Sequence, residues 1–318
     1  MRSGLRSLIP LALLVLEVAA PRTAQAQQFQ PKKYTDPQTN QILEYNVVVP
    51  TGYDASADKQ YPLLVCLHAA SNVNPPNRTL SSDGKCWVPQ LMSADAGKNP
   101  SFYMIPISQS NSSGWGDAGP GTPITQAQKF EGRLTVVVIK ELLSTYKIDP
   151  DRLYILGPSM GARGSWDIVR RNPGMFAAAA PAAGPASAAD AQLYLKDNIW
   201  SINGQTDSTA QDNRTAIAAI RAAGGNPIHT ELANRGHDTW RTLFVMPEFV
   251  AWMFAQRRGV PWWTHPPSVP STYPMATLTG PAVVPPANLP QSFPGSDSAG
   301  MAGSGGAPLG AGGTGGAP

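Results

Sequence analysis

Cysteine, histidine and charged residues are all scarce in this 318-residue chain. It has two cysteines and four histidines, and only 14% of its residues are charged. No group of cysteines and histidines has the spacing of a zinc site, so we expect no metal centre. The formal charge of +3 is small for this length. It excludes the strongly basic surface that proteins use to bind nucleic acid or anionic lipid.

Long apolar runs are also missing, except at the N-terminus. Leu8–Ala20 is apolar apart from one proline and one glutamate, and it follows two arginines. A membrane anchor is the alternative interpretation, but a span needs roughly 20 apolar residues. The small residues of Ala24–Ala26 are typical of a signal-peptidase site. We therefore predict a signal peptide at 1–26 and a secreted or periplasmic protein, whose formal charge falls to +1 once three arginines and one glutamate are removed.

The two cysteines leave two interpretations open. Cys66 lies in an apolar stretch, where a buried free thiol is common. An exported protein can instead form a disulfide with Cys86. The sequence does not supply the geometry that would decide between them.

The composition divides the rest of the chain into two parts. Residues 27–258 have the length and apolar content of one domain. Prolines crowd the start of 259–318, and glycine, alanine and serine dominate its end, so we expect a linker or a disordered tail there. Alternatively, the aromatic residues of this segment pack back on the domain; they are Trp262, Trp263 and Tyr273.

Apolar stretches of strand length alternate with stretches of helical periodicity through the domain. The expected strands are Ile42–Val49, Tyr61–Leu67, Phe102–Ile107, Arg152–Leu156, Phe176–Ala183, Ile199–Asn203 and Ile228–Leu232. The expected helices are Gln126–Tyr146, Gly161–Arg171, Asp212–Ala223 and Thr239–Gln256. This alternation predicts an α/β fold with a mostly parallel sheet and helices on both faces.

A G-x-S-x-G pattern follows one of the expected strands. Gly157–Gly161 reads Gly-Pro-Ser-Met-Gly and leads directly into an expected helix. In this context the pattern predicts a sharp strand-to-helix turn that exposes Ser159 as a nucleophile above a helix N-terminus. The five residues alone are equally compatible with a turn that contains an incidental serine.

The histidine that would activate this serine is found by chain order. Where such an elbow is catalytic, the acid and then the histidine follow the serine. His237 lies in a loop after the last expected strand, which is where the base belongs. The other histidines fit less well: His68 precedes the elbow, His229 lies within a strand, and His265 lies in the tail.

The acid is expected after the preceding strand. Asp207 follows Ile199–Asn203 closely, and a carboxylate there can accept the proton on the far ring nitrogen of His237. Asp212 is a rival, although its position suggests a helix N-cap. Asp238 is too near His237 in sequence to face its ring easily.

Two backbone N–H groups are expected to form an oxyanion hole. One belongs to Met160, the residue after the nucleophile. The other lies in the loop after Tyr61–Leu67, where Ala70 is the favoured donor and Ala69 the alternative. We expect His68 to have a structural role, holding this loop by hydrogen bonds.

Several segments together resemble a known family. They are Pro50–Tyr53, Tyr61–His68, Tyr146–Tyr154, Ser159–Asp167, Gly236–Trp240 and Trp252–Gln256. On these, the chain resembles the secreted esterases near the polyhydroxybutyrate depolymerase and feruloyl esterase groups, which are often labelled predicted peptidases or phospholipase/carboxylesterase-like proteins. The resemblance covers most of 40–257, and its motifs are more specific for the superfamily than for any substrate.

The resemblance implies an α/β-hydrolase fold, an ester substrate and no cofactor. It also implies Ser159 as nucleophile, Asp207 as acid and His237 as base. Two residues depart from the family pattern: Ala69 stands where glycine is usual in the oxyanion loop, and Ala162 where a second glycine is usual after the elbow.

The resemblance also bears on how substrates reach the serine. Only about 16 residues separate Phe176–Ala183 from Ile199, which is too few for the cap domain that such hydrolases can carry there. We therefore expect an open site that suits ester groups on large or polymeric molecules. The candidates to line it are Trp87, Trp115, Trp166 and Trp240, although core packing is the favoured role for any single one of them.

Two other functions stay open at this stage. A peptidase of prolyl-oligopeptidase type uses the same elbow, although no propeller-like domain precedes it here. A non-catalytic carbohydrate- or surface-binding protein that kept a hydrolase fold is the other, and Ala69 is its best support. Neither the particular ester nor the oligomeric state follows from the sequence.

Overall fold

A computed structural model describes residues 29–70, 91, 95, 97–110, 114–239 and 246–264. The predicted signal peptide lies outside the described residues, as do Cys86, Trp87, Trp240, His265 and Tyr273. No helix within the described ranges has the length and apolar character needed to cross a bilayer.

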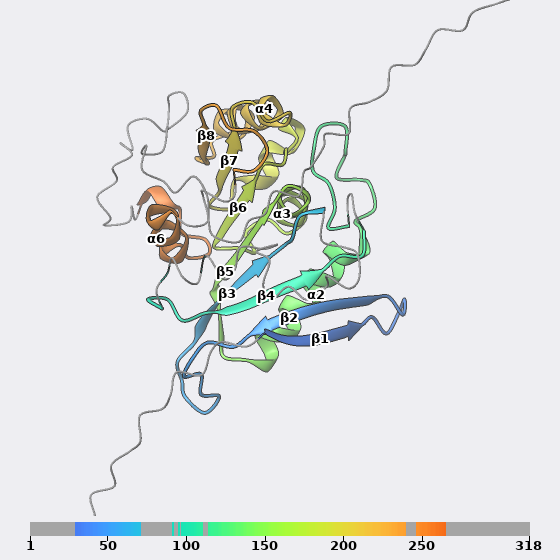
Figure 1. Cartoon of the computed structure of the whole chain (residues 1–318), viewed down its shortest axis with the longest axis vertical. Helices are drawn as coiled ribbons and strands as arrows, with labels where there is room; N and C mark the ends of the chain where they lie inside the picture. The colour runs from blue at the N-terminus through green and yellow to red at the C-terminus, as the bar shows by residue number, and fades with distance from the viewer. Residues whose placement is uncertain are drawn as a thin grey trace, which may run out of the picture. The chain divides into compact units, whose positions relative to one another are not determined.

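An eight-stranded sheet runs through the described domain (Figure 1). Its strands are β1 (Phe29–Thr35), β2 (Ile42–Val48), β3 (Tyr61–Cys66), β4 (Phe102–Ile107), β5 (Ile148–Pro158), β6 (Ala178–Ala182), β7 (Trp200–Gly204) and β8 (Ile228–Leu232). They lie in the order β1-β2-β4-β3-β5-β6-β7-β8. The pairs β1–β2 and β2–β4 are antiparallel and all the others are parallel, so the sheet is mostly parallel, as predicted.

The helices lie against both faces of this sheet. They are α2 (Phe130–Thr145), α3 (Met160–Arg171), α4 (Ala210–Ala222) and α6 (Pro247–Ala255), with short 3-10 helices η2 (Ala188–Tyr194) and η3 (Trp262–Thr264). Neighbouring residues of β5 show the two layers, because successive side chains of a strand point to opposite faces. Ile155 packs in the core with α2 and α3, whereas the ring of Tyr154 lies 5.6 Å from that of Phe254 in α6. Figure 1 shows α6 on the other side of the sheet from α2 and α3.

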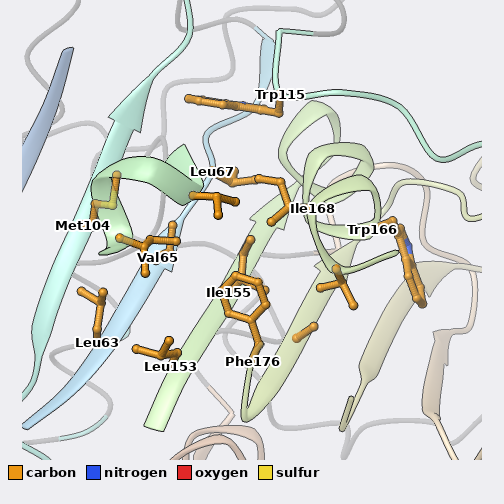
Figure 2. Close-up of a cluster of buried hydrophobic side chains, with 14 of the residues drawn as sticks. Leu63, Val65, Leu67, Met104, Trp115, Leu153, Ile155, Trp166, Ile168 and Phe176 are labelled. Carbon is orange, nitrogen blue, oxygen red and sulfur yellow. The ribbon is translucent and has the colours of Figure 1, made fainter. Parts of the chain in front are cut away.

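The main hydrophobic core lies between the central strands and helices α2 and α3. Alternate residues of β3 and β5 enter it, and Figure 2 shows Leu63, Val65, Leu153 and Ile155 pointing to the same side. Each of these four side chains is fully buried. The core holds the carboxyl ends of β3 and β5 side by side, and the functional loops begin there.

Several element boundaries differ from those predicted. Strand β5 is longer than expected, and β1 was not predicted, because its side chains are mostly exposed and polar. The last helix begins at Pro247 rather than at Thr239. Helix α4 begins after Thr209, so the prediction that Asp212 is its N-cap is wrong; Asp212 lies in the first turn instead.

The connection between β6 and β7 contains only η2, so no cap domain is inserted there, as predicted.

Near the C-terminal end of the domain, Trp262 packs back onto it, as the alternative interpretation of the tail proposed. Its ring is fully buried, its backbone N–H donates to Asn198, and its indole N–H donates to the carbonyl of Asn226. The chain therefore contributes to the domain up to at least η3.

Cys66 is buried in β3 and is disulfide-bonded, so the interpretation of a free thiol is wrong. Cys86 is the only other cysteine of the sequence, and it lies outside the described residues.

Candidate active site

Ser159 lies on a strained turn between β5 and α3. Its φ of +53° falls in a region that non-glycine residues rarely adopt. Its N–H donates to the carbonyl of Ala182 at the end of β6, at 2.8 Å. The turn is therefore held by the neighbouring strand, and Ser159 stands at the carboxyl edge of the sheet.

The two glycines of the motif allow β3 to approach this turn. A Cβ on Gly161 would lie 1.9 Å from the carbonyl oxygen of Leu67, and one on Gly157 would lie 2.6 Å from the same atom. Real Cβ atoms do not approach backbone so closely, so only glycine fits at either position. The spacing of the motif thus places the end of β3 directly against the elbow.

Ser159 occupies the N-cap position of α3 without capping it. A serine at this position commonly accepts a hydrogen bond from a helix N–H. Here the side chain makes no such bond, and its Oγ lies 2.8 Å from Nε2 of His237. The hydroxyl therefore faces a base rather than its own helix.

The far side of the His237 ring faces a buried carboxylate. Nδ1 of His237 lies 2.9 Å from Oδ2 of Asp207. The other oxygen, Oδ1, accepts from the backbone N–H of Thr209 at 2.8 Å and from its hydroxyl at 3.0 Å. The structure thus brings Ser159, His237 and Asp207 together in one hydrogen-bonded row.

Burial and hydrogen bonding act in opposite directions on Asp207. Burial raises the pKa of a carboxyl group, but the hydrogen bonds from His237 and Thr209 outweigh it and hold the pKa of Asp207 below its ordinary value. The Asp207 side chain is completely buried, whereas that of His237 is 49% exposed. A buried, charged acid therefore orients a ring that is half exposed.

The loops that carry the acid and the base are joined directly. Both the N–H and the hydroxyl of Thr206 donate to the carbonyl of Arg235, at 3.0 and 2.9 Å. A Cβ on Gly204 would lie 2.1 Å from the carbonyl oxygen of Gly236, so glycine is required there as well. We call the joined segments 204–207 and 234–237 the triad clamp. It sets the separation of Asp207 and His237.

The loop after β3 lies beside the elbow, as predicted for the oxyanion loop. His68 is fully buried there; its Nε2 accepts from the N–H of Ser108 at 3.0 Å, and its Nδ1 lies 2.8 Å from the carbonyl oxygen of Ala69. His68 thus has the structural contacts expected of it. At the elbow, the first helical hydrogen bonds are those from Ala162 and Arg163 to the carbonyl of Ser159. The N–H of Met160 precedes this ladder, as a donor to an oxyanion must.

The other candidate residues of the sequence have different positions. Trp115 and Trp166 are fully buried in the core, the role favoured for any single tryptophan, so they do not line the site. Their indole N–H groups donate to the carbonyls of His68 and Gly184. Trp240 and Trp87 lie outside the described residues. Asp238 lies 3.7 Å from Arg235, and its side chain is 53% exposed.

The sequence analysis missed the residues that hold the site from behind, Thr206 and Ser108 among them. The Thr206 hydroxyl donates to the carbonyl of Arg235, and the Ser108 N–H donates to the His68 ring. Each partner is far away in sequence, and no motif marks either residue. The sequence did contain a partial indication that Trp115 is buried. Helices α2 and α3 each contain a glycine, and Trp115 packs against both. A Cβ on Gly132 or on Gly164 would lie 2.1 or 2.2 Å from its atoms.

Comparison with known proteins gives likeness in structure only. No family model matches the sequence, and no curated protein matches it. Among solved structures, a thermostable esterase superposes with a TM-score of 0.63 at 24% identity, over 72% of this chain and 63% of that one. A ferulic acid esterase gives a TM-score of 0.55 at 19% identity, over 72% of this chain and 99% of that one.

A feruloyl esterase module from Clostridium thermocellum, complexed with sinapinate, gives a TM-score of 0.51 at 15% identity, over 70% of this chain and 87% of that one. The chain spans less than two thirds of the thermostable esterase. At these identities the likeness establishes the fold. Together with the strand order and the elbow, it confirms the predicted α/β-hydrolase fold without a cap domain.

Proposed function

We propose that this protein is a serine hydrolase of carboxylic esters that acts through an acyl-enzyme. The observation that carries the proposal is the row of hydrogen bonds Ser159 Oγ–His237 Nε2–His237 Nδ1–Asp207 Oδ2, with separations of 2.8 and 2.9 Å. A serine hydroxyl becomes a nucleophile when a base accepts its proton, and the base needs an oriented tautomer to do so.

The proposed reaction has two halves. Ser159 Oγ attacks the ester carbonyl while its proton passes to His237 Nε2, and the carbonyl oxygen becomes an oxyanion bound by N–H groups of Met160 and Ala70. The carbon–oxygen bond to the alcohol then breaks, and His237 returns the proton to the departing alkoxide. Water attacks the acyl-serine with His237 as base, and the carboxylic acid leaves as Ser159 regains its proton.

The exposure of His237 supports the proposal that the substrate is large. Half of the His237 side chain is exposed, and no cap lies between β6 and β7. A recessed site would admit only small esters, whereas this one suits ester groups carried by polysaccharides, polyesters or other polymers. A ferulic acid esterase and a feruloyl esterase module among the structural neighbours support an ester as the substrate. We further propose that the protein works outside the cytoplasm, as its N-terminal segment predicts.

The nucleophile is tested by replacing its hydroxyl. Ser159→Ala should lose turnover of p-nitrophenyl acetate by at least about 10³-fold, since no acyl-enzyme can form. It should also lose labelling by a fluorophosphonate probe and keep its circular dichroism spectrum. Ser144→Ala is the matched control, because Ser144 is an exposed serine on α2 that donates only to the carbonyl of Glu141.

Unchanged turnover in Ser159→Ala contradicts the triad. Two other functions make different predictions for the wild-type protein. A peptidase of prolyl-oligopeptidase type would cleave peptidyl-prolyl substrates faster than esters. A non-catalytic binding protein would leave the fluorophosphonate unreacted. Methyl ferulate and a short-chain polyhydroxyalkanoate, assayed side by side, then separate the aromatic and the polyester substrates.

A further inference from the structure

Trp115 and His68 hold the loop that faces Ser159 from the β3 side. Both side chains are fully buried, and their rings meet edge to face with centroids 4.9 Å apart. Figure 2 shows Trp115 above Leu67, the last residue before this loop, and near Ile168 of α3. The loop thus rests on two aromatic rings that substrate does not reach.

The two side chains bind two successive carbonyl groups. The indole N–H of Trp115 donates to the carbonyl oxygen of His68 at 3.0 Å. His68 Nε2 accepts from the N–H of Ser108, so the proton of the neutral ring is on Nδ1, which donates to the carbonyl oxygen of Ala69 at 2.8 Å. The carbonyls of His68 and Ala69 therefore have fixed directions.

A fixed carbonyl also fixes the next N–H, because the peptide unit is planar and its C=O and N–H point in opposite directions. The contact at His68 sets the N–H of Ala69, and the contact at Ala69 sets the N–H of Ala70. These are the two donors that the sequence offers for the second half of the oxyanion hole. Both are thus aligned from behind by buried side chains.

Trp115 is itself held tightly. Gly132 of α2 lies against its carbonyl, and Gly164 of α3 lies against its Cβ, where any larger residue would clash. Glycine within a helix is less favourable than alanine, so two helices accept a less favourable residue at the positions where this tryptophan packs. The position of its indole N–H is set by both helices.

From these contacts we propose that Trp115 is a positioning residue for the oxyanion hole. This inference rests on the proposed ester hydrolysis. Trp115, acting through the carbonyl of His68 and together with the His68 ring, orients the N–H groups of Ala69 and Ala70 toward the carbonyl oxygen of the substrate.

Trp115→Phe tests the proposal by removing the N–H and keeping an aromatic ring. An oxyanion donor contributes about 10²- to 10³-fold to kcat, and a misaligned donor keeps part of that. We expect kcat for p-nitrophenyl acetate to fall at least about tenfold and KM to stay within about twofold. Because a trifluoromethyl ketone forms a tetrahedral oxyanion on the serine, its affinity should fall by about the same factor as kcat/KM.

Trp252→Phe is the matched control. Trp252 is as deeply buried in α6, and within the described part of the chain its indole N–H has no hydrogen-bond partner. It should match wild-type kcat although it loses similar packing. If Trp115→Phe does not fold, β-(3-benzothienyl)alanine at position 115 keeps the volume, lacks the N–H, and should show the same loss of kcat.

Each result has one meaning. If Trp115→Phe, or the benzothienyl isostere in its place, has the same kcat as Trp252→Phe, the positioning role is overturned. The proposed function stays intact in that case. Wild-type protein that turns over no ester overturns the proposed function and this inference with it. A fall in ketone affinity at unchanged KM supports the inference, because a general loss of structure would weaken both.

Discussion

At the scale of single residues, the most informative side chain is the carboxylate of Asp207. It is buried and yet its pKa lies below the ordinary value, because donors from His237 and Thr209 outweigh the cost of burial. It therefore stays charged at neutral pH. A charged acceptor on Nδ1 keeps the lone pair of the neutral ring on Nε2, toward Ser159.

Asp207→Asn removes that charge with little change in shape. The amide can donate an N–H to Nδ1 of His237, which favours the tautomer with its proton on Nε2. In that tautomer Nε2 cannot accept the proton of Ser159. We expect kcat for p-nitrophenyl acetate to fall roughly 10³- to 10⁴-fold. Asp212→Asn, the rival from the sequence, is the control and should leave kcat unchanged. An equal loss in both variants would remove Asp207 from the proposed mechanism.

The residues of the triad follow from the sequence because their order and their places at strand ends are local properties. Ser159, Asp207 and His237 each lie just after a strand, and parallel strands bring such positions to one edge. The roles of Trp115 and Trp166 do not follow in this way. An aromatic ring suits a core and a substrate cleft equally. Only neighbours distant in sequence decide between them, such as Gly164 against Trp115 and the Gly184 carbonyl that accepts from Trp166.

At the scale of elements, the triad clamp connects the ends of β7 and β8. The side-chain amide oxygen of Gln205 accepts from the N–H of Asn234, in addition to the two bonds from Thr206 to Arg235. Asn234 has a φ of +57°, so the loop bends sharply at this point. The acid and base turns therefore form one hydrogen-bonded unit.

Thr206→Val tests whether this unit matters for catalysis, since valine has the shape of threonine without its hydroxyl. We expect a three- to tenfold lower kcat, because small misplacements of a catalytic group are costly. The low-field proton resonance of the His237–Asp207 hydrogen bond should shift or broaden. Thr215→Val is the control, an exposed threonine of α4 whose hydroxyl also donates to a backbone carbonyl. An unchanged resonance in Thr206→Val would contradict the role of the clamp.

Elements were predictable from the sequence where burial makes the pattern strong. The fully buried strands β3 and β4 were predicted within one residue of their bounds. Strand β1 was missed because it lies at the edge of the described sheet, pairs with β2 alone among the described strands and exposes most of its side chains. Its place depends on pairing with a distant segment, and local periodicity carries no signal of that.

At the scale of the whole molecule, two buried groups outside the active site oppose each other in their response to pH. Burial raises the pKa of Asp197 to about 7, although hydrogen bonds from Gly174 and Phe176 act in the other direction. Burial lowers the pKa of His229 to about 4, with Glu231 raising it and neighbouring arginines lowering it further. Each group is neutral in the folded state over a range where it is charged in the unfolded chain.

The signs of the two effects differ. Between pH 3.8 and 7 the folded state keeps a proton on Asp197 that the unfolded chain has lost, so the free energy of unfolding falls as pH rises. Between pH 4 and 6.5 the unfolded chain binds a proton at His229 that the folded state lacks, so the free energy of unfolding rises with pH. Over their common range the two slopes compensate.

Single substitutions should separate these slopes. In wild-type protein, unfolded in urea between about pH 4.5 and 6.5, the combined contribution of these two groups to the free energy of unfolding should be nearly constant. Asp197→Asn leaves His229 alone, so stability should rise with pH, whereas His229→Gln leaves Asp197 alone, so stability should fall. In the double variant this contribution should be flat again, because neither position then titrates. Parallel curves for all four proteins would mean that burial does not perturb these two groups. The fall in stability at acid pH would then come from carboxylates that pair with arginines. Asp36 is one of them, because its pKa is lowered to about 2 by hydrogen bonds that include one from Arg133.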